Sequence, residues 1–151
     1  MSLSGIPVLE DLYPVTMDMW PIESKDFNRI HPFYENLKSG KLTTTRCKAC
    51  GKAFFPPRSD CFHSLTSDME WFEVTGAGTL LTFSTLRYAP VGFEGDLPYT
   101  IAVVDYGDYK VFGRIDKAIA SPDEELKVGM SMKAVAGKTA NGQNTYFFQK
   151  A

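Results

Sequence analysis

The chain has few of the residues that most often carry enzyme chemistry or stabilise secreted proteins. Among its 151 residues there are three cysteines and two histidines. All three cysteines fall within 15 residues, which fits a metal cluster in a reducing compartment better than a disulfide framework. Two histidines leave few candidates for a general base that works near neutral pH. The composition therefore disfavours both disulfide-rich secreted domains and histidine-centred enzymes.

Long apolar runs are absent as well. No stretch approaches the ~20 apolar residues that cross a membrane, and the start has no basic region followed by an apolar core and a small-residue cleavage site. We therefore expect a cytoplasmic protein with no membrane contact. Charged residues make up 23% and hydrophobic residues 44%, which is typical of a folded globular protein.

The small net charge of −2 hides an uneven distribution. Residues 1–40 carry six acids and three bases, and residues 70–151 carry ten acids and eight bases. Between these segments, residues 41–59 hold no acid and five bases: Lys41, Arg46, Lys48, Lys52 and Arg58. This basic island is the part of the sequence best suited to contact an anionic partner, although such a cluster also serves solubility alone.

The basic island contains a metal-binding motif with one position changed. Cys47 and Cys50, two residues apart and followed by glycine, can turn both thiolates toward one ion. A second pair would start at Cys61, but Ser64 stands at its fourth-ligand position. A serine hydroxyl must ionise to bind zinc, so His63 is the better local donor, with solvent or a distant residue as alternatives. The candidate zinc ligands are therefore Cys47, Cys50, Cys61 and His63, unless the ribbon has lost its metal and folds by packing alone.

The first 40 residues predict an extended arm and a short helix. Residues 1–30 mix prolines with isolated apolar side chains, and burying these requires packing on the body of the chain or on another subunit, which includes a homo-oligomer. A helix is predicted from His31-Pro32, because proline suits the first helical turn, and the Ser39-Gly40 pair ends it. The spacing of Phe33, Tyr34 and Leu37 places them together on this helix.

Residues 41–69 predict a small ribbon. Two short β-prone runs, residues 42–46 and 53–55, flank the first cysteine pair as the arms of a hairpin would. Two prolines then end the second arm. If the metal is absent, the phenylalanines and prolines of this segment have to hold the ribbon by packing.

Residues 70–151 predict a barrel of short strands. Short β-prone runs begin near residue 70. The segment Ser121-Pro122-Asp123-Glu124 has the pattern of a capping box and predicts a short helix. The main strands are expected at residues 79–88, 98–106, 109–116, 130–136 and 145–149. Five short strands with one short helix before the fourth favour a small closed barrel of the OB type.

A knuckle ribbon followed by a five-stranded barrel resembles the DUF35 family, which joins a rubredoxin-like zinc ribbon to an OB-fold domain. The resemblance spans roughly residues 30–148 and rests on the order of short motifs: Arg46-Cys47-Lys48-Ala49-Cys50-Gly51, Phe55-Pro56-Pro57-Arg58, Gly76-Ala77-Gly78-Thr79-Leu80, Leu97-Pro98-Tyr99, Phe112-Gly113-Arg114-Ile115 and Leu126-Lys127-Val128-Gly129-Met130. Where the family has Cys-Pro-x-Cys, this chain has Cys61-Phe62-His63-Ser64. The implied fold is mainly β: an N-terminal arm and helix, a small rubredoxin-like ribbon hairpin and an OB-fold-like barrel.

The resemblance implies an accessory role on acyl-coenzyme A. Similar proteins are non-catalytic scaffolds that partner thiolase-like or hydratase-like enzymes and accommodate the coenzyme A or acyl part of the substrate. The sequence agrees, because it contains no nucleophile elbow, histidine-centred triad or telling pair of carboxylates. Coenzyme A or acyl-coenzyme A would need cations for its phosphates, and the candidates are Arg46, Lys52 and Arg58.

Two other functions compete with this one. An OB barrel can bind single-stranded nucleic acid on aromatic side chains, and the aromatic candidates are Tyr88, Tyr99, Tyr106, Tyr109, Phe112, Tyr146, Phe147 and Phe148. Aromatic residues on strands are more often core or cross-strand partners, and the net acidic barrel segment opposes a phosphate-tracking groove. The third function is a purely structural subunit that binds no ligand.

Overall fold

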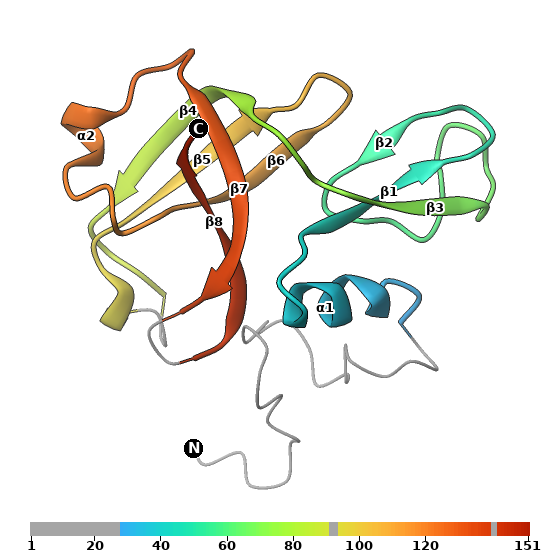
Figure 1. Ribbon diagram of the computed structural model, residues 1–151, viewed down its shortest axis with the longest axis horizontal. Helices are drawn as coiled ribbons and strands as arrows, with labels where there is room; N and C mark the ends of the chain where they lie inside the picture. The colour runs from blue at the N-terminus through green and yellow to red at the C-terminus, as the bar shows by residue number, and fades with distance from the viewer. Residues whose placement is uncertain (1–27, 91–93, 140–141) are drawn as a thin grey trace, which may run out of the picture.

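The computed structural model describes residues 28–90, 94–139 and 142–151. The predicted arm of residues 1–30 therefore lies almost wholly outside the described residues. The described chain forms a short helix, a three-stranded sheet and a closed barrel (Figure 1). The mainly β fold expected from the sequence, with its small ribbon and its five-stranded barrel, is confirmed.

The helix α1 spans His31–Lys38 as its sequence predicts. Proline stands in its first turn and Lys38 in its last turn, where a cation interacts favourably with the helix dipole. The chain leaves the helix through Gly40, whose φ of +81° suits a residue without a β-carbon. Leu37 is buried and packs the helix against the hydrophobic core.

The ribbon is a sheet of three antiparallel strands in the order β2-β1-β3. They are β1 (Thr43–Cys47), β2 (Ala53–Phe54) and β3 (Met69–Glu73). The sequence places the start of the barrel near residue 70, but β3 pairs along its whole length with β1 instead. A strand shows its propensity in its own residues, whereas its partner depends on the path of the chain. Where one domain ends and the next begins stays a prediction.

The barrel closes in the order β4-β5-β6-β8-β7, with β7 returning to β4. Its strands are β4 (Gly78–Leu86), β5 (Tyr99–Asp105), β6 (Lys110–Ile115), β7 (Ser131–Lys138) and β8 (Asn144–Lys150). The contact between β6 and β8 is parallel and the other strand pairs are antiparallel. This is the five-stranded arrangement of an OB fold.

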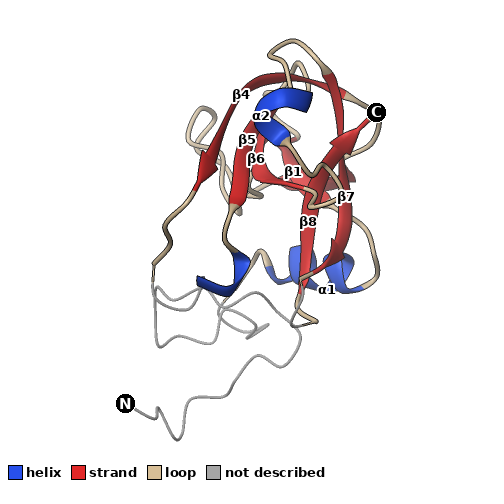
Figure 2. Ribbon diagram, turned by 90° about the vertical axis from the view of Figure 1, so that its left-hand side faces the viewer, coloured by secondary structure: helices blue, strands red, loops and turns tan. Residues whose placement is uncertain are grey.

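Two short helical turns complete the barrel. They are η1 (Glu94–Asp96) before β5 and α2 (Pro122–Glu125) before β7, and Figure 2 shows α1 and α2 near opposite ends of the barrel. The capping box expected at Ser121 differs in detail. The hydroxyl of Ser121 makes no cap, and its backbone N–H donates to Oε1 of Glu125 at 3.1 Å, so Glu125 takes the role that the spacing assigns to Glu124.

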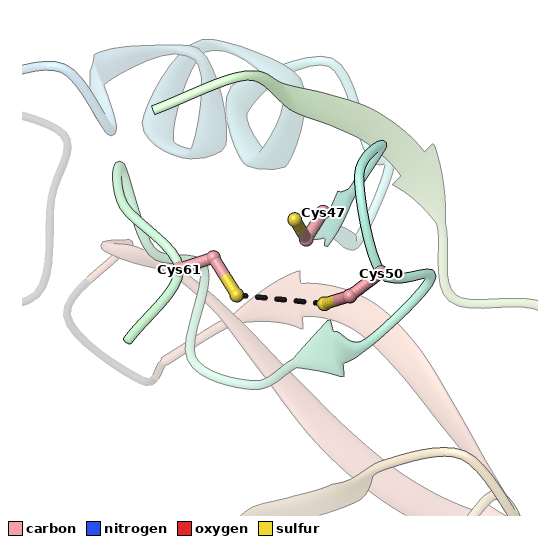
Figure 3. Close-up of side chains that lie close together, drawn as sticks. All are labelled: Cys47, Cys50 and Cys61. Carbon is pink, nitrogen blue, oxygen red and sulfur yellow. Dashed lines mark hydrogen bonds between the residues drawn. The ribbon is translucent and has the colours of Figure 1, made fainter. Parts of the chain in front are cut away.

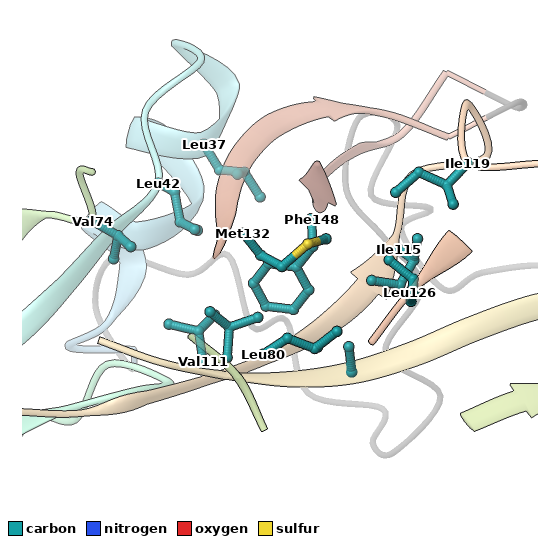
Figure 4. Close-up of a cluster of buried hydrophobic side chains, with 12 residues drawn as sticks. Leu37, Leu42, Val74, Leu80, Val111, Ile115, Ile119, Leu126, Met132 and Phe148 are labelled. Atoms are coloured by element: carbon teal, nitrogen blue, oxygen red, sulfur yellow. The ribbon is translucent and has the colours of Figure 1, made fainter. Parts of the chain in front are cut away.

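One hydrophobic core joins the ribbon to the barrel. Leu37 of α1, Leu42 before β1 and Val74 after β3 belong to the same buried cluster as the barrel residues (Figure 4). The barrel contributes Leu80, Ala102, Val104, Val111, Ile115, Ile119, Leu126, Met132 and Phe148. A backbone hydrogen bond from Val74 to Leu42 closes the seam at 2.8 Å. The ribbon therefore packs directly against the barrel through this shared core.

Candidate functional site

The local backbone gathers the three cysteines at the end of the ribbon. Cys47 ends β1, and the following turn is closed by a hydrogen bond from the backbone N–H of Gly51 to its carbonyl at 2.8 Å. Gly51 has a φ of +73°, which explains the glycine after the second cysteine. Cys61 is fixed from the other side by a β-bridge to Thr66. The three Sγ atoms lie within 4.8 Å of one another, and those of Cys50 and Cys61 are 3.6 Å apart (Figure 3).

This geometry fits a tetrahedral metal ion. Zinc–sulfur bonds of about 2.3 Å at tetrahedral angles place neighbouring sulfur atoms about 3.8 Å apart. The side chains of Cys47 and Cys61 are buried, whereas Cys50 is exposed. Three sulfur donors that face one another in a partly buried loop suit a soft divalent ion. The chain therefore holds a cluster of three thiols that can bind a metal ion.

The residue that the structure places beside the three thiols is Ser64, whereas His63, the predicted fourth ligand, points elsewhere. The hydroxyl of Ser64 lies 3.0 Å from Sγ of Cys47, and its backbone N–H donates to Sγ of Cys61 at 3.5 Å. His63 is exposed and is not part of the group of potential ligands. Chemical preference favours the imidazole as a donor, but the loop turns the next side chain toward the sulfur atoms. A fourth ligand from Ser64, directly or through water, stays a proposal.

The cluster also shifts the acidity of its thiols. Hydrogen bonding from the Ser64 hydroxyl, supported by backbone N–H groups, lowers the pKa of Cys61 to about 6 against the effect of burial. The N–H of Lys52 lowers the pKa of Cys50, but desolvation and the two neighbouring thiols outweigh it and the pKa is raised overall. The lowered pKa of Cys61 favours its thiolate form, which is the form that binds a metal ion.

The three bases proposed for phosphate contact do not form one group. The guanidinium of Arg46 lies 3.2 Å from the carboxylate of Asp108 on the β5–β6 turn, and it packs 4.8 Å from the ring centre of Phe72. Lys52 and Arg58 instead share the ring of Phe62, at 5.3 and 5.2 Å from its centre. Arg46 is thus engaged in joining the ribbon to the barrel, while the other two stand together.

An apolar groove that no sequence pattern predicts lies at the junction of α1, the ribbon and the barrel. It has a volume of about 540 Å³. Its walls come from three parts of the chain: Phe33, Tyr34 and Leu37 of α1, the Phe55-Pro56 segment of the ribbon, and barrel residues that include Leu86, Tyr99, Ile101, Phe112 and Tyr146. The spacing of the helical aromatics predicted that they share a face, but nothing in the sequence says what lies opposite.

Aromatic contacts build one wall of this groove. The rings of Phe33 and Phe55 meet edge to face at 6.4 Å, and Phe55 meets Tyr146 at 5.6 Å. The hydroxyl of Tyr146 donates to the carbonyl of Phe112 at 2.6 Å, and burial raises the pKa of Tyr146. These rings hold one another in place. The wall of the groove is therefore fixed by contacts within the protein itself.

The polar end of the groove is already neutralised. Arg114 lines it, and its guanidinium lies 2.7 Å from the carboxylate of Asp96 and 4.1 Å from the ring centre of Tyr99. Neither histidine lines it, since His31 faces Glu35 at 3.3 Å on α1 and His63 is on the metal loop. The groove offers apolar surface and shape, not a charged catalytic pair.

None of the helices in the described ranges has the length and apolar character of a membrane span.

The aromatic residues proposed for base stacking divide into two classes. Phe148 is in the core, and Tyr106 and Tyr109 stack on each other with ring centres 5.5 Å apart. Tyr88 and Phe112 are exposed. The structural preference for core and cross-strand contacts therefore accounts for several of them, as the sequence indicated.

Two family models match adjoining segments of the chain. Residues 35–70 match the family model "ChsH2, rubredoxin-like zinc ribbon domain", and residues 71–137 match "ChsH2, C-terminal OB-fold domain". The two matches adjoin and together cover more than half of the chain.

Relatives with a stated role support the same assignment. A DUF35 domain-containing scaffold protein of Methanocaldococcus jannaschii is 31% identical over 96 residues, which are 62% of this chain and 66% of that protein. One of the same description from Pyrococcus furiosus is 31% identical over 88 residues, 58% of this chain and 63% of its own. The chain thus spans slightly less than two-thirds of these relatives.

A solved structure has the same fold. One chain of the structure described as "Ltp2-ChsH2(DUF35) aldolase" superposes with a TM-score of 0.68 at 21% identity, covering 84% of this chain and 98% of that one. At this identity the likeness concerns the fold.

Proposed function

Because the chain belongs to the DUF35 family and joins a ChsH2-type zinc ribbon to a ChsH2-type OB fold, we propose that it is a non-catalytic accessory subunit that scaffolds an enzyme acting on acyl-coenzyme A. The observation that carries this proposal is the groove of about 540 Å³ between α1, the ribbon and the barrel. The groove has the size of a small-molecule site. Among the described residues that line it, no two form a reactive pair of the kind that a catalytic site needs.

The groove suits the acyl or pantetheine part of the substrate. Apolar side chains such as Phe33, Leu86 and Ile101 line it, and each buried methylene group of a ligand contributes about 0.8 kcal/mol. An acyl chain several methylenes long would therefore be held by dispersion and burial without a strong polar contact.

The phosphates need cations that are free to receive them. Of our three candidates, Arg46 is paired with Asp108, whereas Lys52 and Arg58 lie within ion-pair distance of no carboxylate among the described residues. Lys52 and Arg58 therefore remain the cations available to an anion, but neither lines the groove, and both flank Phe62 on the ribbon instead. Phosphate contact by these two residues is the weaker part of the proposal, because an acidic partner protein would occupy the same two cations. The three thiols would hold zinc, which supplies a rigid cross-link for the loop and no chemistry of its own in this function.

The partner enzyme is proposed as thiolase-like or hydratase-like. The scaffold descriptions of the relatives and the aldolase described for the structural neighbour favour an enzyme partner. Affinity purification of the full chain from its native cells, followed by mass spectrometry, tests this. We expect an acyl-coenzyme A enzyme in a fixed ratio to the chain. Recovery of the chain alone, or with unrelated proteins only, would refute the scaffold role.

Ligand binding is tested by calorimetry with acyl-coenzyme A on the purified complex. Phe112→Ala, on the groove wall, should weaken binding by about 10-fold, the cost of losing roughly 1.4 kcal/mol of apolar contact. Tyr88→Ala is the matched control, because Tyr88 is also an exposed aromatic but does not line the groove. Salt-sensitive binding of single-stranded oligonucleotides in place of acyl-coenzyme A would support the nucleic-acid function instead.

A further inference from the structure

The end of the ribbon that lies away from the barrel carries two exposed apolar side chains. Phe62 is 57% exposed and Leu65 is 89% exposed. Both belong to the loop between Cys61 and Thr66. We propose that this ribbon tip, made of Lys52, Arg58, Phe62 and Leu65, is the docking surface for the partner enzyme, and that it fits an apolar patch bordered by carboxylates. The proposal rests on the scaffold function and names the surface that performs it.

The backbone at Leu65 is the first observation that supports docking. Its φ is +53°. In the part of the chain that the structure describes, every other residue with a positive φ is a glycine. The left-handed conformation is strained for a residue with a bulky side chain, and a leucine that stays in water gains nothing from burial in return. Both costs vanish if glycine occupies the position. A residue that is unfavourable to the isolated chain in two ways is expected where a partner covers it.

The loop holds these side chains outward by fixed contacts. The backbone N–H of Cys61 donates to the carbonyl of Thr66 at 2.8 Å, and the N–H of Asp68 donates to the hydroxyl of Thr66 at 3.1 Å. On the other side, the ring of Phe62 packs edge to face on buried Phe54 at 5.6 Å. A shallow hollow of about 330 Å³ lies between Phe62, Leu65 and Arg58. The surface is therefore rigid, which lowers the entropic cost of binding.

Charge specifies the chemistry of the partner. Arg46 and Lys48 of the basic island are paired with Asp108 and Asp68, but Lys52 and Arg58 flank Phe62 without such a partner in the described chain. The nearby acid is Asp60, whose carboxylate receives the hydroxyl of Ser59 at 2.6 Å and lies 3.8 Å from Arg29. Asp60 also lines the hollow, and Arg58 as well as Arg29 helps to lower the pKa of its carboxyl group. With Lys52, Arg58 and Arg29 around this carboxylate, the tip keeps a net positive charge beside its apolar centre, which is complementary to an acidic rim.

The test separates docking from stability. Leu65→Gly should raise or preserve the melting temperature of the isolated chain, since glycine relieves the backbone, and yet weaken its affinity for the purified partner enzyme at least 10-fold. Phe62→Ser should weaken it similarly. Val128→Ser is the control, because Val128 is an aliphatic residue 66% exposed on the barrel, and it should leave the affinity unchanged. Metal content is measured for each variant, so that a lost metal site is not mistaken for lost docking.

Failure of the inference and failure of the scaffold function give different results. If the partner binds Leu65→Gly and Phe62→Ser as it binds the natural chain, the tip is not the docking surface and the scaffold function stands. If no enzyme copurifies, the scaffold function fails, and a display selection with random 12-residue peptides tests the tip alone. Enriched peptides that combine Asp or Glu with apolar residues, and that lose binding to Leu65→Gly, support the inference. No enrichment, or binding that the variants leave unchanged, overturns it.

Discussion

Ser64 decides the chemistry of the ribbon because it stands where a fourth thiolate would complete the site. Its hydroxyl reaches Sγ of Cys47 at 3.0 Å, so a thiol in its place would face the same centre. We predict that Ser64→Cys raises zinc affinity by at least about 10-fold. Competition with a chromophoric chelator measures the gain, and cobalt substitution shows whether a fourth sulfur binds. Ser67→Cys, on the same loop, provides the control, and an equal gain there would contradict the assignment.

Cys61 makes the stability of the metal-free protein depend on pH. Its pKa is lowered to about 6 in the folded state from an ordinary value near 9. The thiolate therefore contributes stability that is fully present above pH 9 and is lost as pH falls through 6. The melting temperature of metal-free protein should rise from pH 6 to pH 9, and Cys61→Ser should flatten this part of the profile. A slope that survives the substitution would assign the effect to another group.

Residue chemistry was the part of the site that the sequence predicted least completely. The spacing of Cys47, Cys50 and Cys61 placed three thiols together, and the structure brings their sulfur atoms within 4.8 Å. Donor strength favours His63 as the fourth ligand, whereas the structure places Ser64 beside the thiols, because the direction of each side chain depends on the loop backbone. Which of the two binds a metal ion stays a prediction. The ion pair of Arg46 with Asp108 joins residues that are 62 positions apart. A contact over this separation cannot be predicted from a local sequence pattern.

The strands β4 and β5 come so close at Gly78 that only glycine fits there. A β-carbon on Gly78, at the start of β4, would lie 2.5 Å from the carbonyl oxygen of Asp105 and 2.7 Å from Cγ1 of Val104. Gly78→Ala should therefore destabilise the protein by about 1–3 kcal/mol, because the obstacle is backbone. Gly95→Ala is the control, since nothing lies within 4 Å of that position. Thermal and urea unfolding measure both, and equal stability of the two variants would count against the close approach.

The elements themselves were largely predictable, and their partners less so. The positions of all five barrel strands and of the helix α1 were predictable from β-propensity, from turn residues, and from prolines and glycines at the ends of elements. The strand β3 was assigned to the barrel segment because its residues are as β-prone as those that follow. Its pairing with β1 arises from the ribbon hairpin beside it, which the residues of β3 do not encode. The groove likewise needs α1, the ribbon and the barrel in place at once.

For the whole molecule, the shared core predicts that ribbon and barrel unfold together. Leu42 at the seam and Leu126 in the barrel are both 3% exposed in the same cluster. Either leucine-to-alanine change should cost about 2–5 kcal/mol. Only Leu42→Ala should also divide a single calorimetric transition into two, because it loosens the seam. Two transitions in Leu126→Ala, or one in both variants, would show that the seam does not control the coupling.

The order of strands leaves the molecule unequally protected against self-association. The barrel strands close into a ring, although β4 pairs with β7 only at Gly78 and Thr79, whereas the ribbon sheet ends in β2 on one side and β3 on the other. Of these two edges in the described chain, β3 has five residues and β2 has two. Glu70 and Glu73 are exposed on β3, where charge discourages another chain from adding a strand. We therefore expect that fibrils formed on storage would start at Met69–Glu73, and that removing these two carboxylates would hasten them.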